Sequence, residues 1–97
     1  MIIAHFKKDS FSVSGHSGYA DIGSDIVCAA VSAMTMLVCN TITEQFHDDA
    51  TIKVNKAQNE VSLSLKKGSE KSRELLEGFR NEMIQLESDY PEFIKIN

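Results

Sequence analysis

The chain is organised around one stretch, GHSGYADIGSDIVC (residues 15–28), in which a glycine-rich loop runs directly into an apolar helix. This stretch contains three of the five glycines in the chain, which are Gly15, Gly18 and Gly23. Because glycine adopts positive φ without strain, such a cluster predicts an irregular and adaptable loop. The stretch also places His16 ahead of the helix and Cys28 inside it.

The sequence predicts where the helix begins. Ser24 is expected to cap it and Asp25 to occupy its first turn, before an apolar run that begins at Ile26. Cys28 would then lie about one turn inside, where free N–H groups and the helix dipole favour a thiolate. An adaptable loop allows His16 to reach that sulfur as a base. These residue types predict a nucleophile with its proton acceptor.

Both residues also have a plain structural interpretation. Free cysteine is among the most buried residue types, so Cys28 in an Ala- and Val-rich helix can be a small hydrophobic residue. A histidine in a loop, such as His16, is commonly just solvated. Since catalytic Cys–His pairs have no fixed separation in sequence, spacing alone leaves both interpretations open.

Two segments, GHSGYA (residues 15–20) and GSDIVCAAVS (residues 23–32), resemble the double motif of the bacterial ribosomal-processing cysteine proteases. The similarity extends over almost the whole chain, including the second hairpin and the tail around residues 90–92. Members of that family remove an N-terminal extension from large-subunit ribosomal protein twenty-seven. The resemblance therefore implies a cysteine endopeptidase that processes a ribosomal protein precursor.

The resemblance also implies a role for individual residues, with Cys28 as nucleophile, His16 as general base and Asp25 as an auxiliary acidic residue close to both. Ser17 stands where the family pattern has alanine, a small departure that changes none of these roles. Amide groups at the start of the helix are the expected oxyanion donors. The candidate substrate-binding residues of the loop are Gly15, Gly18, Tyr19, Gly23 and Ser24.

Tyr19 has two possible roles, because an aromatic residue in this loop can stack on a substrate side chain or pin the loop shut. A second hypothesis for the whole chain is a non-catalytic, ribosome-associated module that binds a peptide or RNA. Such a module would not need the pair formed by His16 and Cys28. No cofactor is expected, and a metal site is not expected either, because the chain has no CxxC or HxxxH spacing.

Length and charge narrow the class of protein. With 97 residues the chain is expected to form one domain over residues 1–97, which the resemblance identifies as a cysteine-protease domain. The formal charge of −4 argues against a general nucleic-acid binder and favours a basic peptide as partner. This charge suits the ribosomal protein precursor that the resemblance implies as substrate, and no direct contact with nucleic acid is expected.

The sequence also indicates where the chain works. Residues 1–8 lack the pattern of a signal peptide, so a cytoplasmic location is expected. The apolar stretch from Ile26 to Cys39 is shorter than the ~20 residues that span a bilayer, and no membrane segment is expected. Cys28 and Cys39 are separated by ~16 Å along a continuous helix, too far for a disulfide. Both are expected to be free thiols.

Hydrophobic periodicity predicts an α+β fold, a two-layer single domain with the element order ββαββαβ. The central helix is apolar nearly all round, which indicates burial on more than one side. Its far face is covered either by a second copy of the chain, giving a homodimer, or by the second helix of the same chain. The expected elements are strands 2–8 and 10–14, helix 25–46, strands 51–55 and 60–65, a helix capped by Ser69, and strand 93–96.

Overall fold

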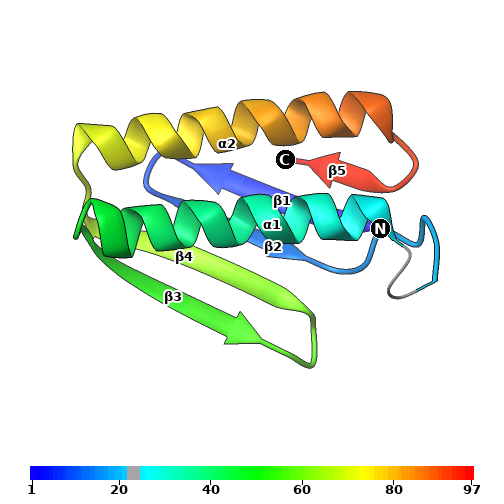
Figure 1. Ribbon diagram of the computed structural model, residues 1–97, viewed down its shortest axis with the longest axis horizontal. Coiled ribbons are helices and arrows are strands. Elements are labelled where there is room, and N and C mark those ends of the chain that lie inside the picture. The colour runs from blue at the N-terminus through cyan, green and yellow to red at the C-terminus, as the bar shows by residue number, and fades with distance from the viewer. Residues whose placement is uncertain (22–24) are drawn as a thin grey trace.

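The computed structural model describes residues 1–21 and 25–97, and within them a five-stranded sheet carries both helices on one face (Figure 1). The order of elements is ββαββαβ, which confirms the predicted α+β class. The helical elements are α1 (Ile26–Asn40), a π-helical turn η1 (Thr41–Gln45) that continues it, and α2 (Glu70–Asp89). The strands are β1 (Ile2–Lys7), β2 (Ser10–Ser14), β3 (Asp49–Asn55), β4 (Glu60–Lys67) and β5 (Ile94–Ile96), in the spatial order β3-β4-β2-β1-β5.

Alternation of apolar and polar residues explains the two faces of the sheet. Ala4 of β1 and Phe11 of β2 are buried under the helices, while the side chains between such positions point to the opposite face. Phe79 of α2 packs edge-on against Phe11, with ring centroids 5.1 Å apart. The final strand pairs in parallel with β1, so the C-terminal segment closes one edge of the sheet. This packing fixes β2, from which the glycine-rich loop departs.

The start of α1 differs from the prediction in one respect, because Asp25 and not Ser24 is its N-cap. The Asp25 carboxylate accepts hydrogen bonds from the N–H groups of Val27 and Cys28, which an N-cap side chain normally does. Ser24 lies outside the described residues. As a consequence, Cys28 is the third residue of the helix.

The helical segment from Ile26 to Gln45 is longer than its apolar stretch suggested. It spans 20 residues and contains an 18-residue window with a mean hydropathy of 1.8, enough by length and composition to cross a membrane. The expectation that this apolar stretch is too short to span a bilayer is therefore wrong, because the helical segment continues past Cys39 to Gln45. A core helix meets the same test, and Val27 and Val31 are buried in the hydrophobic core of the domain.

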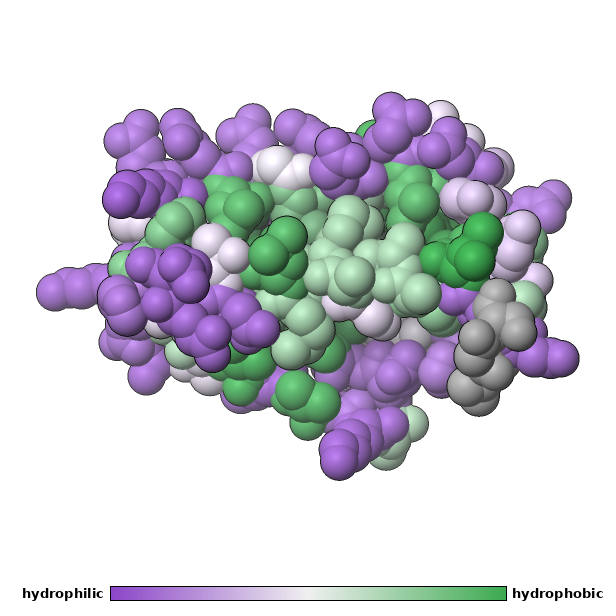
Figure 2. All heavy atoms as spheres, in the orientation of Figure 1, coloured by the Kyte–Doolittle hydropathy of each residue, from purple (hydrophilic) through white to green (hydrophobic). Residues whose placement is uncertain are grey.

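The outer face of α1 is apolar and exposed. Figure 2 shows hydrophobic residues in a band across the middle of this view, over α1, with hydrophilic residues along α2. Ile26, Met36 and Leu37 have exposed fractions of 55%, 51% and 66%. The second helix of the same chain flanks α1 and does not cover these side chains. The expectation that the second helix of the same chain covers this face is therefore wrong for these three residues.

Candidate active site

A groove of about 450 Å³ runs between α1 and the strands β2 and β4, and its walls are mostly apolar. The loop enters the groove from β2 and the helix forms the opposite wall. Five of the site residues predicted from the sequence line it, namely Gly15, His16, Gly18, Asp25 and Cys28. Candidates from the loop and from the helix thus meet at the place where the two elements join.

The sulfur of Cys28 is held by Ser17. The backbone N–H of Ser17 donates to Sγ at 3.2 Å, and the thiol lies 3.6 Å from the Ser17 hydroxyl oxygen. Ser17 is itself buried, with an exposed fraction of 3%. The sequence did not predict that Ser17 lies next to the sulfur, because there it differs from the family pattern only as a serine in place of alanine. The feature that could have indicated this role is a hydroxyl side chain directly after His16, in a loop expected to face Cys28.

The Asp25 carboxylate is the centre of the hydrogen bonds at the start of α1. One oxygen accepts the N–H groups of Val27 at 3.0 Å and Cys28 at 2.9 Å, and the other accepts the Ser17 hydroxyl. These donors stabilise the charged form, and the Ser17 hydroxyl has the largest effect. Together they lower the pKa of Asp25 to about 2. Asp25 is therefore a fixed anion that ties the loop to the helix.

Three amides in the first turn of α1 are not free for an oxyanion. The N–H groups of Val27 and Cys28 already donate to Asp25, and that of Ala29 donates to the Asp25 carbonyl oxygen at 3.0 Å. The expectation that amides at the start of the helix serve as oxyanion donors is therefore wrong for Val27, Cys28 and Ala29. The amide that faces the sulfur belongs to Ser17, which lies in the loop.

His16 is exposed and turned toward the tip of the β3–β4 hairpin. Its Nδ1 lies 3.5 Å from the side-chain nitrogen of Asn59, which also donates to the carbonyl oxygen of Gly15 at 2.8 Å. Among the described residues no hydrogen bond joins His16 to Cys28, although both line the groove. Catalytic hydrogen bonds are often absent or long without substrate, so this arrangement is compatible with a role as base. Asn59 was not a candidate in the sequence.

The other loop candidates divide between the groove and its surroundings. Gly15 and Gly18 adopt positive φ of 91° and 73°, and both line the groove. Tyr19 packs edge-on against Tyr90 and Phe93, with ring centroids 5.6 and 5.3 Å apart. This packing favours the second of its two possible roles, fixing the loop to the C-terminal segment. Gly23 and Ser24 lie outside the described residues.

The two cysteines are free thiols, as the sequence predicted. Cys28 is half-buried and lines the groove, whereas Cys39 is buried in the core with an exposed fraction of 2%. Burial raises the pKa of the Cys39 thiol, since an apolar environment disfavours its charged form. The two sulfur atoms therefore differ in access and in surroundings.

The Ser17–Asp25 hydrogen bond predicts how stability changes with acid. Because the pKa of Asp25 is about 2 in the fold and 3.8 ordinarily, its stabilisation is complete above about pH 4 and is lost as pH falls toward 2. Ser17→Ala and Asp25→Asn should each shrink the difference in unfolding free energy between about pH 6 and about pH 3. Urea unfolding at the two pH values measures this difference.

Ser64→Ala is the matched control for that measurement, since Ser64 is exposed on β4. It should leave the acid dependence as it is in the unmodified chain. Asp9 and Asp48, whose pKa values are lowered by Arg73 and by Ser69, preserve part of the dependence in every variant. An unchanged difference in Ser17→Ala would show that its hydroxyl does not hold the Asp25 charge.

Solved structures with the same fold include proteases. A ribosomal processing protease Prp from S. aureus with a covalently linked product peptide has a TM-score of 0.86 and 20% identity, covering 99% of this chain and 95% of that one. The same protease with a substrate peptide gives a TM-score of 0.80 at 19% identity and the same coverage. SMU.848 from Streptococcus mutans is 27% identical, with a TM-score of 0.85, and the match covers 100% of this chain and 92% of that one.

The sequence itself matches a family profile described as cysteine protease Prp, over residues 1–95. No match was found among curated protein sequences. The family match spans the loop, the helix with Cys28 and nearly all of the remaining chain. The chain therefore belongs to the Prp family of cysteine proteases.

Proposed function

We propose that this protein is a cysteine endopeptidase that removes the N-terminal extension of large-subunit ribosomal protein twenty-seven during ribosome assembly. The observation that carries the proposal is the groove in which Cys28, His16 and Asp25 meet, on a chain of a cysteine protease family. A half-buried sulfur at the edge of an apolar groove is accessible to a peptide and partly shielded from water. We assign this activity to the cytoplasm, where ribosomes assemble.

The chemistry follows from the position of each group. The His16 imidazole turns from Asn59 toward the sulfur and takes the thiol proton, and the thiolate attacks the scissile carbonyl carbon. The protonated imidazole then gives its proton to the leaving amine, and water hydrolyses the thioester that remains. Ser17 supplies a backbone N–H beside the sulfur, suited to the charge that develops on the carbonyl oxygen.

The surface around the groove suits an extended peptide from a basic protein. Its apolar walls accommodate aliphatic side chains, and the chain has a formal charge of −4. Opposite charge speeds the encounter of enzyme and substrate more than it strengthens their complex. A non-catalytic binding module with the same groove is the alternative, and it has no use for a cysteine held next to a histidine loop.

A cleavage assay distinguishes the protease from the non-catalytic binding module. The protein is incubated with a synthetic peptide spanning the start of the host's own ribosomal protein twenty-seven precursor, and the products are identified by mass spectrometry. The protease hypothesis requires two fragments from one cut, whereas a binding module retains the intact peptide. A host precursor without a removable extension would eliminate the proposed substrate.

We further propose a homodimer formed through the exposed face of α1, because Ile26, Met36 and Leu37 leave apolar surface in water. Sedimentation at micromolar concentration should give about twice the chain mass of 10.8 kDa. Leu37→Glu should give the monomer mass, because it puts a charge into the interface. Ile84→Glu, on an exposed part of α2, is the control and should remain dimeric. A monomer in the unmodified protein would refute the proposal.

A further inference from the structure

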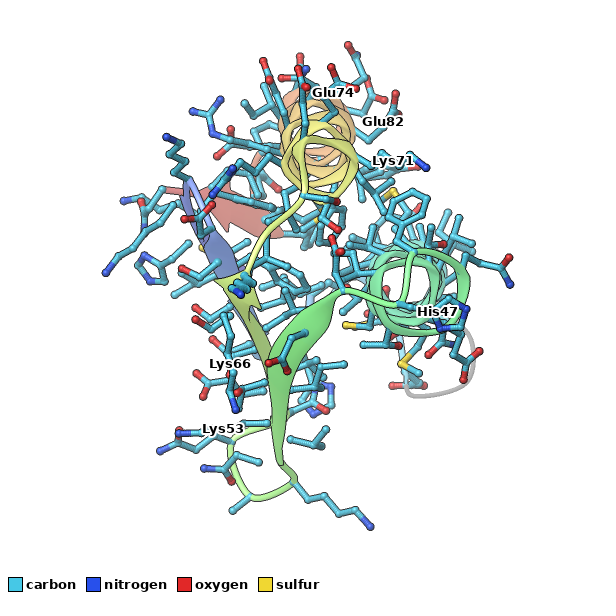
Figure 3. All side chains as sticks on the ribbon, turned by 90° about the vertical axis from the view of Figure 1, so that its left-hand side faces the viewer. His47, Lys53, Lys66, Lys71, Glu74 and Glu82 are labelled. Atoms are coloured by element: carbon cyan, nitrogen blue, oxygen red, sulfur yellow. The ribbon has the colours of Figure 1, made fainter. Side chains whose placement is uncertain are left out.

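The face of the sheet that the helices leave uncovered, here called the open face, carries mainly one sign of charge. Strand register and alternation place four lysines on it, Lys7, Lys53, Lys66 and Lys95. Figure 3 shows Lys53 and Lys66 on the side of the sheet away from α1. The same register places the acidic Glu60 on this face, and at the irregularity where β3 begins Asp49 pairs with Lys67, a pair that adds no net charge. The open face therefore has a formal charge of +3.

This positive charge is segregated from the rest of the molecule. The whole chain is −4, so everything outside the open face carries −7. Glu74 and Glu82 lie on α2, on the other side of the molecule from Lys53 (Figure 3). Within residues 1–21 and 25–97 the ion pair is Arg73 with Asp9, at 2.7 Å, so the four lysines are not neutralised by carboxylates. A face that only has to be soluble needs polarity and not one sign of charge.

Hydroxyl groups fill the space between the lysines. One row across four strands contains His5, Ser12, Ser62 and Lys53, and the next contains Lys7, Ser10, Ser64 and Thr51. At ~4.8 Å between strands, each row is about 14 Å long. These side chains line a shallow cavity of about 480 Å³. Lys7 and Lys53 therefore stand at opposite corners of a surface of hydrogen-bond donors.

We propose that the open face binds the phosphate backbone of RNA. Phosphate oxygens accept hydrogen bonds from lysine and from serine or threonine hydroxyls, and this face presents both on a rigid sheet. The expectation of no direct nucleic-acid partner came from the net charge, which averages over the two sides of the molecule. RNA is favoured over an acidic protein because the two central rows consist of small polar side chains between point charges.

The groove and the open face lie on opposite sides of the sheet, so RNA and a peptide can be bound at the same time. For a protease acting at an assembling ribosome, contact with RNA would raise the local concentration of precursor. RNA binding itself does not depend on whether the peptide is cut. Failure of the cleavage assay and failure of the RNA measurement are therefore separate outcomes.

The test uses a fluorescein-labelled, single-stranded RNA of mixed sequence and measures Kd by anisotropy at several salt concentrations. The double variant Lys7→Glu/Lys53→Glu should bind at least about tenfold more weakly at about 50 mM salt, and its salt dependence should be flatter by about 1.4, which corresponds to two phosphate contacts on a single strand. The matched control is Lys56→Glu/Lys71→Glu, which changes the net charge equally but away from the open face. It should bind RNA within about twofold of the unmodified protein.

Three results would overturn the proposal. The first is equal loss of RNA binding in both double variants, which would assign the effect to net charge. The second is no RNA binding by the unmodified protein at about 50 mM salt, where phosphate contacts are strong. The third is tighter binding of poly-glutamate than of RNA with the same sensitivity to Lys7 and Lys53, which would assign the face to an acidic protein. Urea unfolding of each variant serves as the check of correct folding.

Discussion

Cys28→Ser is expected to abolish cleavage of the ribosomal precursor peptide, with a fall of at least about 10⁴-fold in kcat/KM. A serine hydroxyl in the same place is too weak a nucleophile for a base arranged for a thiol. His16→Ala should cause a loss of similar size, since nucleophile and base act as a unit. Asp25→Asn should cost only about 10- to 100-fold, because this side chain positions other groups and transfers no proton. Timed mass spectrometry of the products measures all three rates.

Cys39→Ser is the control for the nucleophile, since Cys39 is buried in the core and is not among the described residues that line the groove around Cys28. It should cleave within about twofold of the unmodified protein if its fold is retained. Iodoacetamide below neutral pH should label Cys28 well before Cys39, because burial both hides the Cys39 sulfur and raises its pKa. Denaturation should reduce the difference in labelling.

Two outcomes would refute these roles. Cleavage by Cys28→Ser at more than about a tenth of the normal rate would remove the nucleophile from the mechanism. Losses of equal size in Asp25→Asn and His16→Ala would instead make Asp25 a full member of a triad. The first outcome favours the binding module, whereas the second changes only the assignment of roles within a protease.

Local patterns in the sequence predicted the elements of the fold and most of their ends. Alternating apolar residues marked β1 and β2 to within a residue. Ser69 was predicted correctly as a helix cap, since its side chain accepts the Ser72 N–H. The order of the strands was not predictable in this way. Pairing of β5 with β1 joins residues more than 90 positions apart, and no local pattern records such a contact.

In the candidate site, too, residues of a continuous motif were predictable and residues that act through long-range contacts were not. His16, Asp25 and Cys28 were identified because they belong to one continuous motif. Ser17 was not predicted as a site residue, because its role depends on contacts with Asp25 and Cys28 that exist only after the loop has folded onto the helix. Asn59 reaches Gly15 from the tip of a hairpin 44 residues further along the chain. Side chains that act through tertiary contacts have no signature at that distance in sequence.

Gly15→Ala should have the largest effect on stability of any single change in the loop. Gly15 has φ of 91°, and a Cβ there would clash with the backbone carbonyl oxygen of Met1. That oxygen cannot easily move, because the adjoining Ile2 N–H is hydrogen-bonded to the Phe93 carbonyl oxygen at 2.9 Å. Left-handed backbone costs about 1–2 kcal/mol and an overpacked contact about 1–3 kcal/mol, so about 3 kcal/mol should be lost in urea unfolding.

Gly18→Ala separates the two causes, because Gly18 has φ of 73° but an added Cβ would meet no atom of the described residues within 4 Å. It should lose only the conformational part, about 1–2 kcal/mol. Gly15→Ala should also lower kcat more than Gly18→Ala, since displacing Gly15 breaks its two hydrogen bonds with Asn59 and moves the adjoining His16. Equal losses of stability and rate in the two variants would show that the Met1 carbonyl yields, and that backbone conformation alone makes Gly15 necessary.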